Sequence, residues 1–200
     1  DIRLSRVGSE MCIRDRYKAM KNAYAGHLKY SFQLRPHTVA DQAYIGAYQG
    51  IGVGYFNFGN PEELGNPLAV YLFQGGRIAQ FSPRISLNYE WNFGASFGWK
   101  PYDEYDNPEN QIIGSKVNAY LNVNLYLKWA LSPKFDLMIG ATGSHFSNGN
   151  TQYPNSGLNT VDCKVGLVYN FNRRADELAQ SWQRPIVHPF PRHVSYDLTL

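Results

Sequence analysis

The sequence has little charge, two cysteines and no long apolar run. Charged residues make up only 18% of its 200 residues, and the net charge of +3 is scattered along the chain. Nucleic-acid binding needs a basic stripe or patch, so we expect no nucleic-acid partner. No run of about eighteen apolar residues occurs, which excludes a transmembrane helix but not a membrane protein.

Clustered metal ligands are also missing from the sequence. Histidines, cysteines and carboxylates do not recur at the spacings of a zinc site. Of the cysteines, Cys12 lies near the N-terminus and Cys163 in the body of the chain. We therefore expect neither a metal nor another cofactor.

The two ends of the chain differ from its middle. Residues 1–16, DIRLSRVGSEMCIRDR, lack periodicity and resemble translated sequencing-adaptor read-through more than a signal peptide. We interpret them as an artefact that replaces the natural N-terminus and its export signal. Residues 172–200 are charged, then proline-rich, and end in VSYDLTL, the start of a further alternation. We expect one domain over residues 17–171, followed by a truncated extension.

Between these ends, apolar side chains alternate with polar or small ones. The alternation is longest over 85–99 (ISLNYEWNFGASFGW) and 117–129 (VNAYLNVNLYLKW). Period two predicts β-strands, and these two are longer than the five or six residues typical of soluble strands. Weaker alternation predicts five more strands, at 27–34, 43–57, 68–74, 135–147 and 160–171. Long and short turn segments separate the seven strands in alternation.

Strands of this length and pattern are typical of membrane barrels, whose spanning strands need about nine to eleven residues. We predict an all-β fold, an antiparallel up-and-down transmembrane β-barrel of about eight strands with its apolar face outward. The eighth strand was either lost at the N-terminus or is supplied by residues 194–200. Glycines on the polar face favour a narrow, crowded lumen. The alternative is a soluble barrel with its apolar face inward that binds a lipophile.

The alternation also places one polar pair on the outward face. The apolar face of 135–147 consists of Phe135, Leu137, Ile139, Ala141 and Gly143. The same parity continues to His145 and Ser147, which then project toward lipid near a barrel rim. Histidine and serine two residues apart on a strand can come within hydrogen-bond reach, as a general base and its nucleophile must. The turn formers that follow equally suit an ordinary loop.

The motif that starts at this pair resembles the lipid A 3-O-deacylase (PagL) family. It reads H-x-S-N followed by P-N-x-G, and comprises His145, Ser147, Asn148, Pro154, Asn155 and Gly157. The resemblance implies an eight-stranded barrel in the outer membrane of a Gram-negative bacterium. It further implies that Ser147 is the nucleophile and His145 the base. Asn148, Asn155 and Gly157 would then form the oxyanion or substrate-binding part.

One position departs from that family pattern, in which the third catalytic member is acidic. This chain has Asn159 there. Asparagine can orient a histidine but cannot stabilise its imidazolium by charge, so we expect weaker catalysis. Asp162, the nearest acid, falls on the inward face by parity, where we expect it to pair with Lys164 or a luminal cation.

The function implied by the resemblance is removal of an ester-linked acyl chain from lipid A or a related glycolipid. The expected partners are this substrate and the lipids of the outer membrane. A catalytically inactive barrel with a structural or adhesive role is the alternative, and it gains weight if Asn159 cannot replace the acid.

Overall fold

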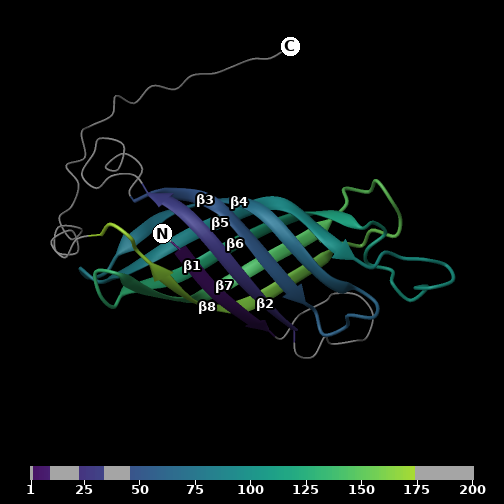
Figure 1. Cartoon of the computed structure of the whole chain (residues 1–200), viewed down its shortest axis with the longest axis horizontal. Coiled ribbons are helices and arrows are strands. Elements are labelled where there is room, and N and C mark those ends of the chain that lie inside the picture. The colour runs from purple at the N-terminus through teal and green to yellow at the C-terminus, as the bar shows by residue number, and fades with distance from the viewer. Residues whose placement is uncertain (1, 10–22, 34–45, 174–200) are drawn as a thin grey trace, which may run out of the picture.

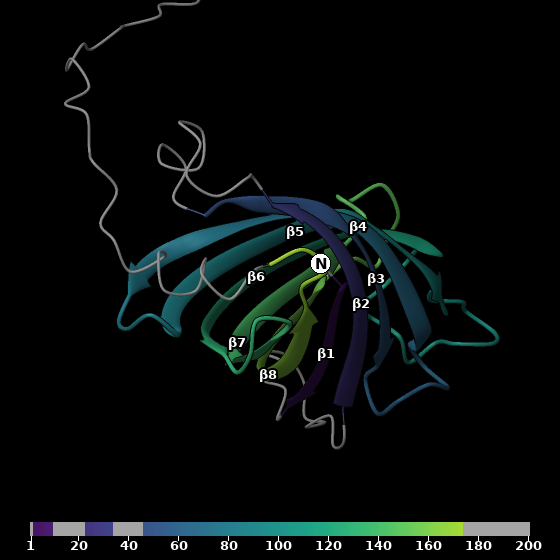
Figure 2. The same ribbon diagram turned by 60° about the vertical axis from the view of Figure 1, so that its left-hand side comes forward.

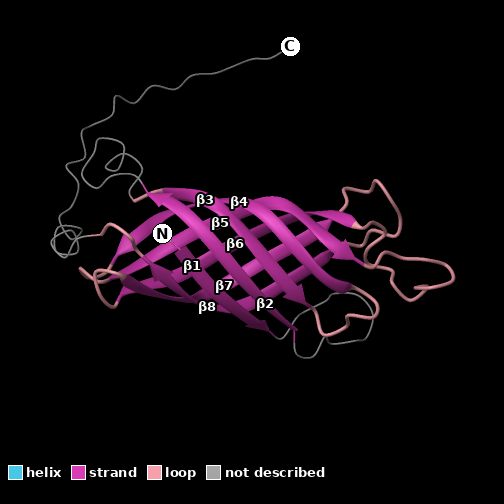
Figure 3. Cartoon of the chain, viewed as in Figure 1, coloured by secondary structure: helices cyan, strands magenta, loops and turns pink. Residues whose placement is uncertain are grey.

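Each strand of the protein pairs with its neighbour in sequence, and the first pairs with the last, so the sheet closes into a barrel (Figures 1 and 3). This computed structural model describes residues 2–9, 23–33 and 46–173. The strands are β1 (Ile2–Ser9), β2 (Ala23–Gln33), β3 (Tyr48–Asn57), β4 (Gly65–Gln80), β5 (Ile85–Trp99), β6 (Val117–Ala130), β7 (Phe135–Ser147) and β8 (Leu158–Tyr169). All neighbours are antiparallel. The predicted up-and-down barrel is therefore confirmed.

None of the described residues belongs to a helix that is long and apolar enough to cross a membrane.

The eighth strand comes from residues 1–16, which the sequence analysis interprets as an artefact. β1 lies within residues 1–16 and pairs with both β2 and β8. Its short alternation buries Arg3 and Ser5 and exposes Leu4, which is too brief a pattern to predict a strand. The prediction of about eight strands is thus confirmed, but the eighth strand is β1, and neither a segment lost at the N-terminus nor residues 194–200 supply it. The adaptor origin of residues 1–16 stays a prediction, and residues 174–200 lie outside the described residues.

The other strand bounds follow the alternation with differences at the ends. The prediction at 68–74 was too short, because β4 spans Gly65–Gln80 and continues through the adjacent glycines Gly75 and Gly76. Gly75 and Gly76 interrupt the apolar pattern but still pair with Glu90 and Tyr89 of β5, whereas the register with β5 shifts between Gly65 and Leu68, at Pro67. Because the strands are long, the polar end of β7, at Ser147, lies well beyond the middle of the barrel.

The two faces of the wall have opposite chemistry. Outward side chains are apolar and solvent-accessible, including Val161 at 67% and Val123 at 64% exposure. Inward side chains are polar or aromatic and buried, such as Asn92 and Tyr71. A barrel that shows an apolar belt to its surroundings is suited to lipid. The soluble alternative, which required the apolar face to point inward, is wrong.

Large inward side chains fill the lumen by packing against inward glycines. A Cβ atom added at Gly52 would lie 2.4 Å from the ring of Tyr71. One added at Gly140 would lie 2.5 Å from the Cα atom of Tyr126. These close approaches explain why the polar face of the strands contains so many glycines, and they agree with the crowded lumen that we predicted.

A carboxylate surrounded by cations occupies the middle of the lumen. The Lys29 ammonium donates to Glu90, which is only 1% exposed. Lys164 Nζ lies 3.6 Å from Glu90 Oε1 and donates to Asn124 at 2.9 Å. Lys164 is therefore paired with Glu90, and the expected pairing with Asp162 is wrong. The prediction failed because alternation fixes the face of a side chain but not its partner across the lumen.

The two ends of the barrel differ in the length of their connections (Figure 1). Among the connections that the structure describes throughout, the short turns at 81–84 and 131–134 close one end, and the longer loops 58–64, 100–116 and 148–157 extend from the other. In outer-membrane barrels, short turns face the periplasm and long loops the exterior. The strand ends at Ser147 and Leu158 therefore lie at the exterior end, which Figure 2 shows from a second direction.

Candidate active site

The polar pair at the end of β7 meets a third polar side chain from the start of β8. His145 and Asn159 are direct partners in the β7–β8 register, so their side chains leave the same face of the sheet. His145 Nδ1 lies 2.7 Å from Asn159 Oδ1, and His145 Nε2 lies 3.0 Å from Ser147 Oγ. The structure thus brings together three residues that we singled out from the sequence.

The hydrogen bonds of His145 define the state of its ring. The amide oxygen of Asn159 can only accept a hydrogen bond, so His145 Nδ1 is the donor and carries the ring proton in this pair. His145 Nε2 is then free to accept from the Ser147 hydroxyl. This arrangement can transfer the serine proton to histidine, which is the chemistry of a general base.

The loop that follows Ser147 is closed by asparagine side chains. The backbone N–H of Asn148 donates to Asn155 Oδ1 at 3.2 Å, and the Asn148 side-chain amide donates to the Gln152 carbonyl at 2.8 Å. Asn155 Nδ2 in turn donates to Asn150 Oδ1 at 2.9 Å. Asn155 therefore fixes the backbone amide directly after Ser147. The roles of Asn148 and Asn155 toward an oxyanion stay predictions.

Gly157 leaves room for the histidine ring. Its φ is +70°, a conformation that glycine adopts without strain. A Cβ atom there would lie 3.1 Å from His145 Cε1 and 3.3 Å from the Phe146 carbonyl oxygen. Sequence reasoning missed this contact with His145, because it spans the β7–β8 loop. The only feature of the sequence that pointed to this contact was Gly157 itself, as the last residue of the P-N-x-G motif.

Aromatic packing supports the site from inside the barrel. Phe146, which lies between His145 and Ser147 in sequence, points inward and is fully buried. Its ring centroid lies 5.1 Å from those of Phe56, Trp99 and Tyr120. Tight packing of this kind holds the backbone of β7, and with it the outward side chains on either side of Phe146.

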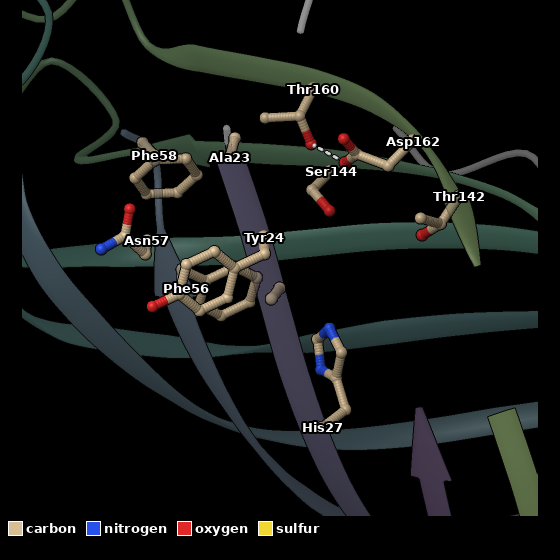
Figure 4. A pocket seen from close by; sticks show the side chains of 11 residues that line it. Ala23, Tyr24, His27, Phe56, Asn57, Phe58, Thr142, Ser144, Thr160 and Asp162 are labelled. Carbon is tan, nitrogen blue, oxygen red and sulfur yellow. Dashed lines mark hydrogen bonds between the residues drawn. The ribbon is translucent and has the colours of Figure 1, made fainter. Parts of the chain in front are cut away.

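Asp162 lies on the opposite side of the wall from His145. Its carboxylate accepts from Thr160 Oγ1 at 2.8 Å, beside an inward cavity that Ser144 and Thr142 also line (Figure 4). The inward position that parity predicted for Asp162 is thus confirmed. Asp162 cannot serve as the third member of the outward cluster.

The described ranges 2–9, 23–33 and 46–173 contain no group of three histidine, cysteine or acidic side chains that could hold a metal ion.

Comparisons with known proteins place this chain in a family. A sequence model described as lipid A 3-O-deacylase (PagL) matches residues 8–170. The comparison with curated proteins gave no match. A crystal structure of the outer membrane enzyme PagL is similar in fold, with 16% identity, 83% of this chain and 98% of that chain covered, and a TM-score of 0.52. The crystal structure of Neisserial surface protein A (NspA) is similar at 10% identity, 85% and 96% coverage, and a TM-score of 0.54. Because the family match spans nearly the whole barrel, the protein is an outer-membrane β-barrel that belongs to the lipid A 3-O-deacylase (PagL) family.

Proposed function

We propose that this protein is a serine esterase that releases an ester-linked acyl chain from lipid A or a related glycolipid. The observation that carries the proposal is the hydrogen-bonded series Ser147–His145–Asn159 on the lipid-facing side of the wall. Its place at the exterior end suits a substrate of the outer leaflet, whose ester groups lie at the border between acyl chains and headgroup. Membership of the family supports the same reaction.

In this proposal, His145 Nε2 takes the proton of Ser147 as the serine oxygen attacks the acyl carbonyl. The tetrahedral intermediate then collapses, its bond to the glycolipid oxygen breaks, and His145 protonates that oxygen to a hydroxyl group, which leaves the acyl chain on Ser147. A water molecule, deprotonated by His145, attacks the acyl-serine ester and releases the fatty acid. Serine and histidine end in their starting states, so the net reaction is hydrolysis of one ester.

The oxyanion donors in this proposal are the amides of Asn148 and Asn155. The Asn148 backbone N–H directly follows the nucleophile, a position that supplies oxyanion donors in other serine hydrolases. This N–H donates to Asn155 Oδ1, so the substrate oxyanion would compete with that oxygen for the donor. Gly157 belongs to this part of the site by allowing the His145 ring its position.

Asn159 is the third member of the proposed triad. Its oxygen holds the His145 proton on Nδ1, which selects the productive tautomer. It offers no negative charge to the imidazolium that forms during proton transfer. We therefore propose an active but slow enzyme.

The second candidate is a catalytically silent barrel with a structural or adhesive role. The neutral Asn159 at the acidic position favours it, as does the similar fold of a surface protein, NspA. This candidate requires no reactive serine, so serine chemistry distinguishes the two.

Acyl release from purified lipid A by the detergent-folded protein tests the proposal. We expect fatty acid release by the unmodified protein, none above background with Ser147→Ala, and faster release with Asn159→Glu. Each variant is first shown to be folded by its shifted mobility on unheated gels. A folded barrel that releases no acid in any variant would support the silent candidate instead.

A further inference from the structure

Two loops at the exterior end of the barrel touch through their backbones. The β5–β6 loop, 100–116, and the β7–β8 loop, 148–157, leave the same end of the barrel (Figure 1). A Cβ atom added at Gly114 would lie 2.7 Å from the Pro154 carbonyl oxygen and 2.9 Å from the Tyr153 carbonyl carbon. Ser156 Oγ also donates to the Gln111 carbonyl at 3.1 Å. Contacts this close leave no space for a side chain at position 114.

Gly114 is held in place from both sides. On its N-terminal side, Ile113 is fully buried, its amide donates to Asn110 Oδ1 at 3.1 Å, and its carbonyl accepts from Tyr102 at 2.8 Å. On its C-terminal side, Ser115 Oγ donates to the Val117 carbonyl at 2.7 Å. Gly114 therefore cannot retreat, and an added methyl group must displace the partner loop.

Asn110 anchors this part of the β5–β6 loop to the barrel rim. It is fully buried, and its side-chain amide donates to the carbonyls of Lys100 at 2.7 Å and Glu63 at 3.1 Å. Its oxygen accepts from the amides of Ile112 and Ile113. The Asn110 side chain thus bonds to the β3–β4 connection, to the residue that follows β5 and to the segment that precedes Gly114.

The segment that a methyl group at position 114 would displace, around Pro154, is connected to Ser147 through Asn155 and Asn148. Pro154 precedes Asn155, whose Oδ1 accepts the backbone N–H of Asn148 at 3.2 Å. Asn148 in turn follows Ser147. Ordinary contact with a Cβ atom begins near 3.4 Å, against 2.7 Å at Gly114, so a methyl group there moves the Pro154 carbonyl by several tenths of an ångström.

We infer that Gly114 is a positioning residue for the oxyanion side of the site, and that the β5–β6 loop is part of the machinery that holds Asn155 and Asn148 against Ser147. This inference rests on the proposed esterase function. It assigns a role to a loop that contributes no reacting group. In this role, position 114 must lack a side chain so that the Pro154 carbonyl keeps its position.

Gly114→Ala in the full chain tests the inference, with Gly26→Ala as the matched control. A Cβ atom at Gly26 meets nothing within 4 Å, and its φ lies outside the left-handed region, as at Gly114. With lipid A in mixed micelles, we expect Gly114→Ala to lower kcat by about ten- to a hundredfold, as misplacements of up to about 1 Å do. KM should stay within about twofold, and Gly26→Ala should match the unmodified protein.

Labelling of Ser147 by a fluorophosphonate supplies a second measurement. The phosphonyl oxygen occupies the oxyanion position, so the labelling rate should fall in Gly114→Ala in parallel with kcat. Ser156→Ala, which removes only the bond to Gln111, should lower both rates in the same direction by a smaller factor. Loss of barrel stability alone would lower the apparent kcat in proportion to the folded fraction and leave KM unchanged, so kcat and the labelling rate are calculated per folded molecule, with the folded fraction taken from gel mobility and thermal unfolding.

The outcomes separate this inference from the function on which it rests. If the unmodified protein is active and Gly114→Ala has the same kcat and labelling rate, the positioning role is wrong and the esterase stands. If Gly114→Ala lowers kcat only in proportion to the folded fraction, the role is structural and the inference is again wrong. If the unmodified folded protein neither releases acid nor labels at Ser147, the esterase is wrong and the inference falls with it.

Discussion

Two polar clusters occur in the barrel wall, one on each face, and they are built differently. The luminal cluster centres on Glu90 and joins full charges, with Lys29 and Lys164 beside the carboxylate. The outward cluster of His145, Ser147 and Asn159 contains hydrogen bonds only and no carboxylate. Both are formed by strand residues, and β8 contributes to both, with Lys164 on the inward face and Asn159 on the outward face.

The two clusters differ in how they hold charge. In the lumen, several cations share one carboxylate, and the asparagines around them satisfy the remaining hydrogen bonds. On the outward face, the third member is the neutral Asn159, at the position where the family pattern has an acid. The luminal cluster holds buried charges inside the barrel, whereas the outward cluster is the proposed reactive site. Each of the variants below acts on one cluster and should leave the other unchanged.

Ser147→Ala should have the largest effect. It removes the nucleophile, and we expect acyl release to fall by at least about 10⁴-fold, since serine hydrolases lose most of their acceleration with this side chain. The hydrogen bond to His145 is lost as well, but no luminal contact changes. Fatty acid release and thermal unfolding are measured on the same preparation. Activity that survives this change would assign the reaction to another residue.

Glu90→Gln should have the next largest effect, on stability alone. It leaves Lys29 and Lys164 without their carboxylate inside the barrel, and breaking a buried ion pair in this way costs about 3–5 kcal/mol. Urea unfolding of the detergent-folded barrel measures the loss. Acyl release per folded molecule should not change, and a drop in turnover at equal stability would show that the two clusters are coupled.

Gly157→Ala should lower turnover by about tenfold to a hundredfold. The added Cβ atom lies 3.1 Å from His145 Cε1 and must be accommodated at a φ of +70°, so the ring moves from its position between Ser147 and Asn159. Gly149→Ala is the control, because it has a φ of +64° but no atom within 4 Å of its added Cβ. Equal losses in both variants would indicate backbone strain as the cause instead of contact with His145.

Asn159→Asp should have the smallest effect, and it should increase the rate. Aspartate has the same shape as asparagine, so a carboxylate oxygen takes the position 2.7 Å from His145 Nδ1. We expect turnover to rise by about tenfold through stabilisation of the imidazolium. A rate that stays level or falls would show that the outward face does not tolerate a charge, and comparison with Asn159→Glu would separate charge from length.

Much of the fold follows from alternation in the sequence, because inward and outward positions differ in chemistry along every long strand. The parity of β7 correctly placed Ser147 beside His145, and that of β8 placed Asp162 on the opposite face. β1 was missed because its described alternation covers too few residues. The closing pairs of the barrel come from backbone hydrogen bonds, which the side-chain pattern does not encode.

The features that refine the site were not predictable in the same way. Gly157 touches His145 across a loop, and Gly114 touches Pro154 from a separate loop. Neither contact follows from strand parity, since loop conformations depend on local turns and on packing between connections. The ion-pair partner of Lys164, Glu90 on β5, and its hydrogen-bond acceptor, Asn124 on β6, were missed for a related reason, because both lie across the lumen.

The packing of inward side chains against glycines distinguishes this barrel from a pore. The Tyr71 ring lies against Gly52 and the Tyr48 ring against Gly75, so side chains occupy space that a solute would have to cross. Porins of about sixteen to eighteen strands leave an aqueous channel along their axis, whereas the described lumen of this barrel holds its own aromatic and charged side chains.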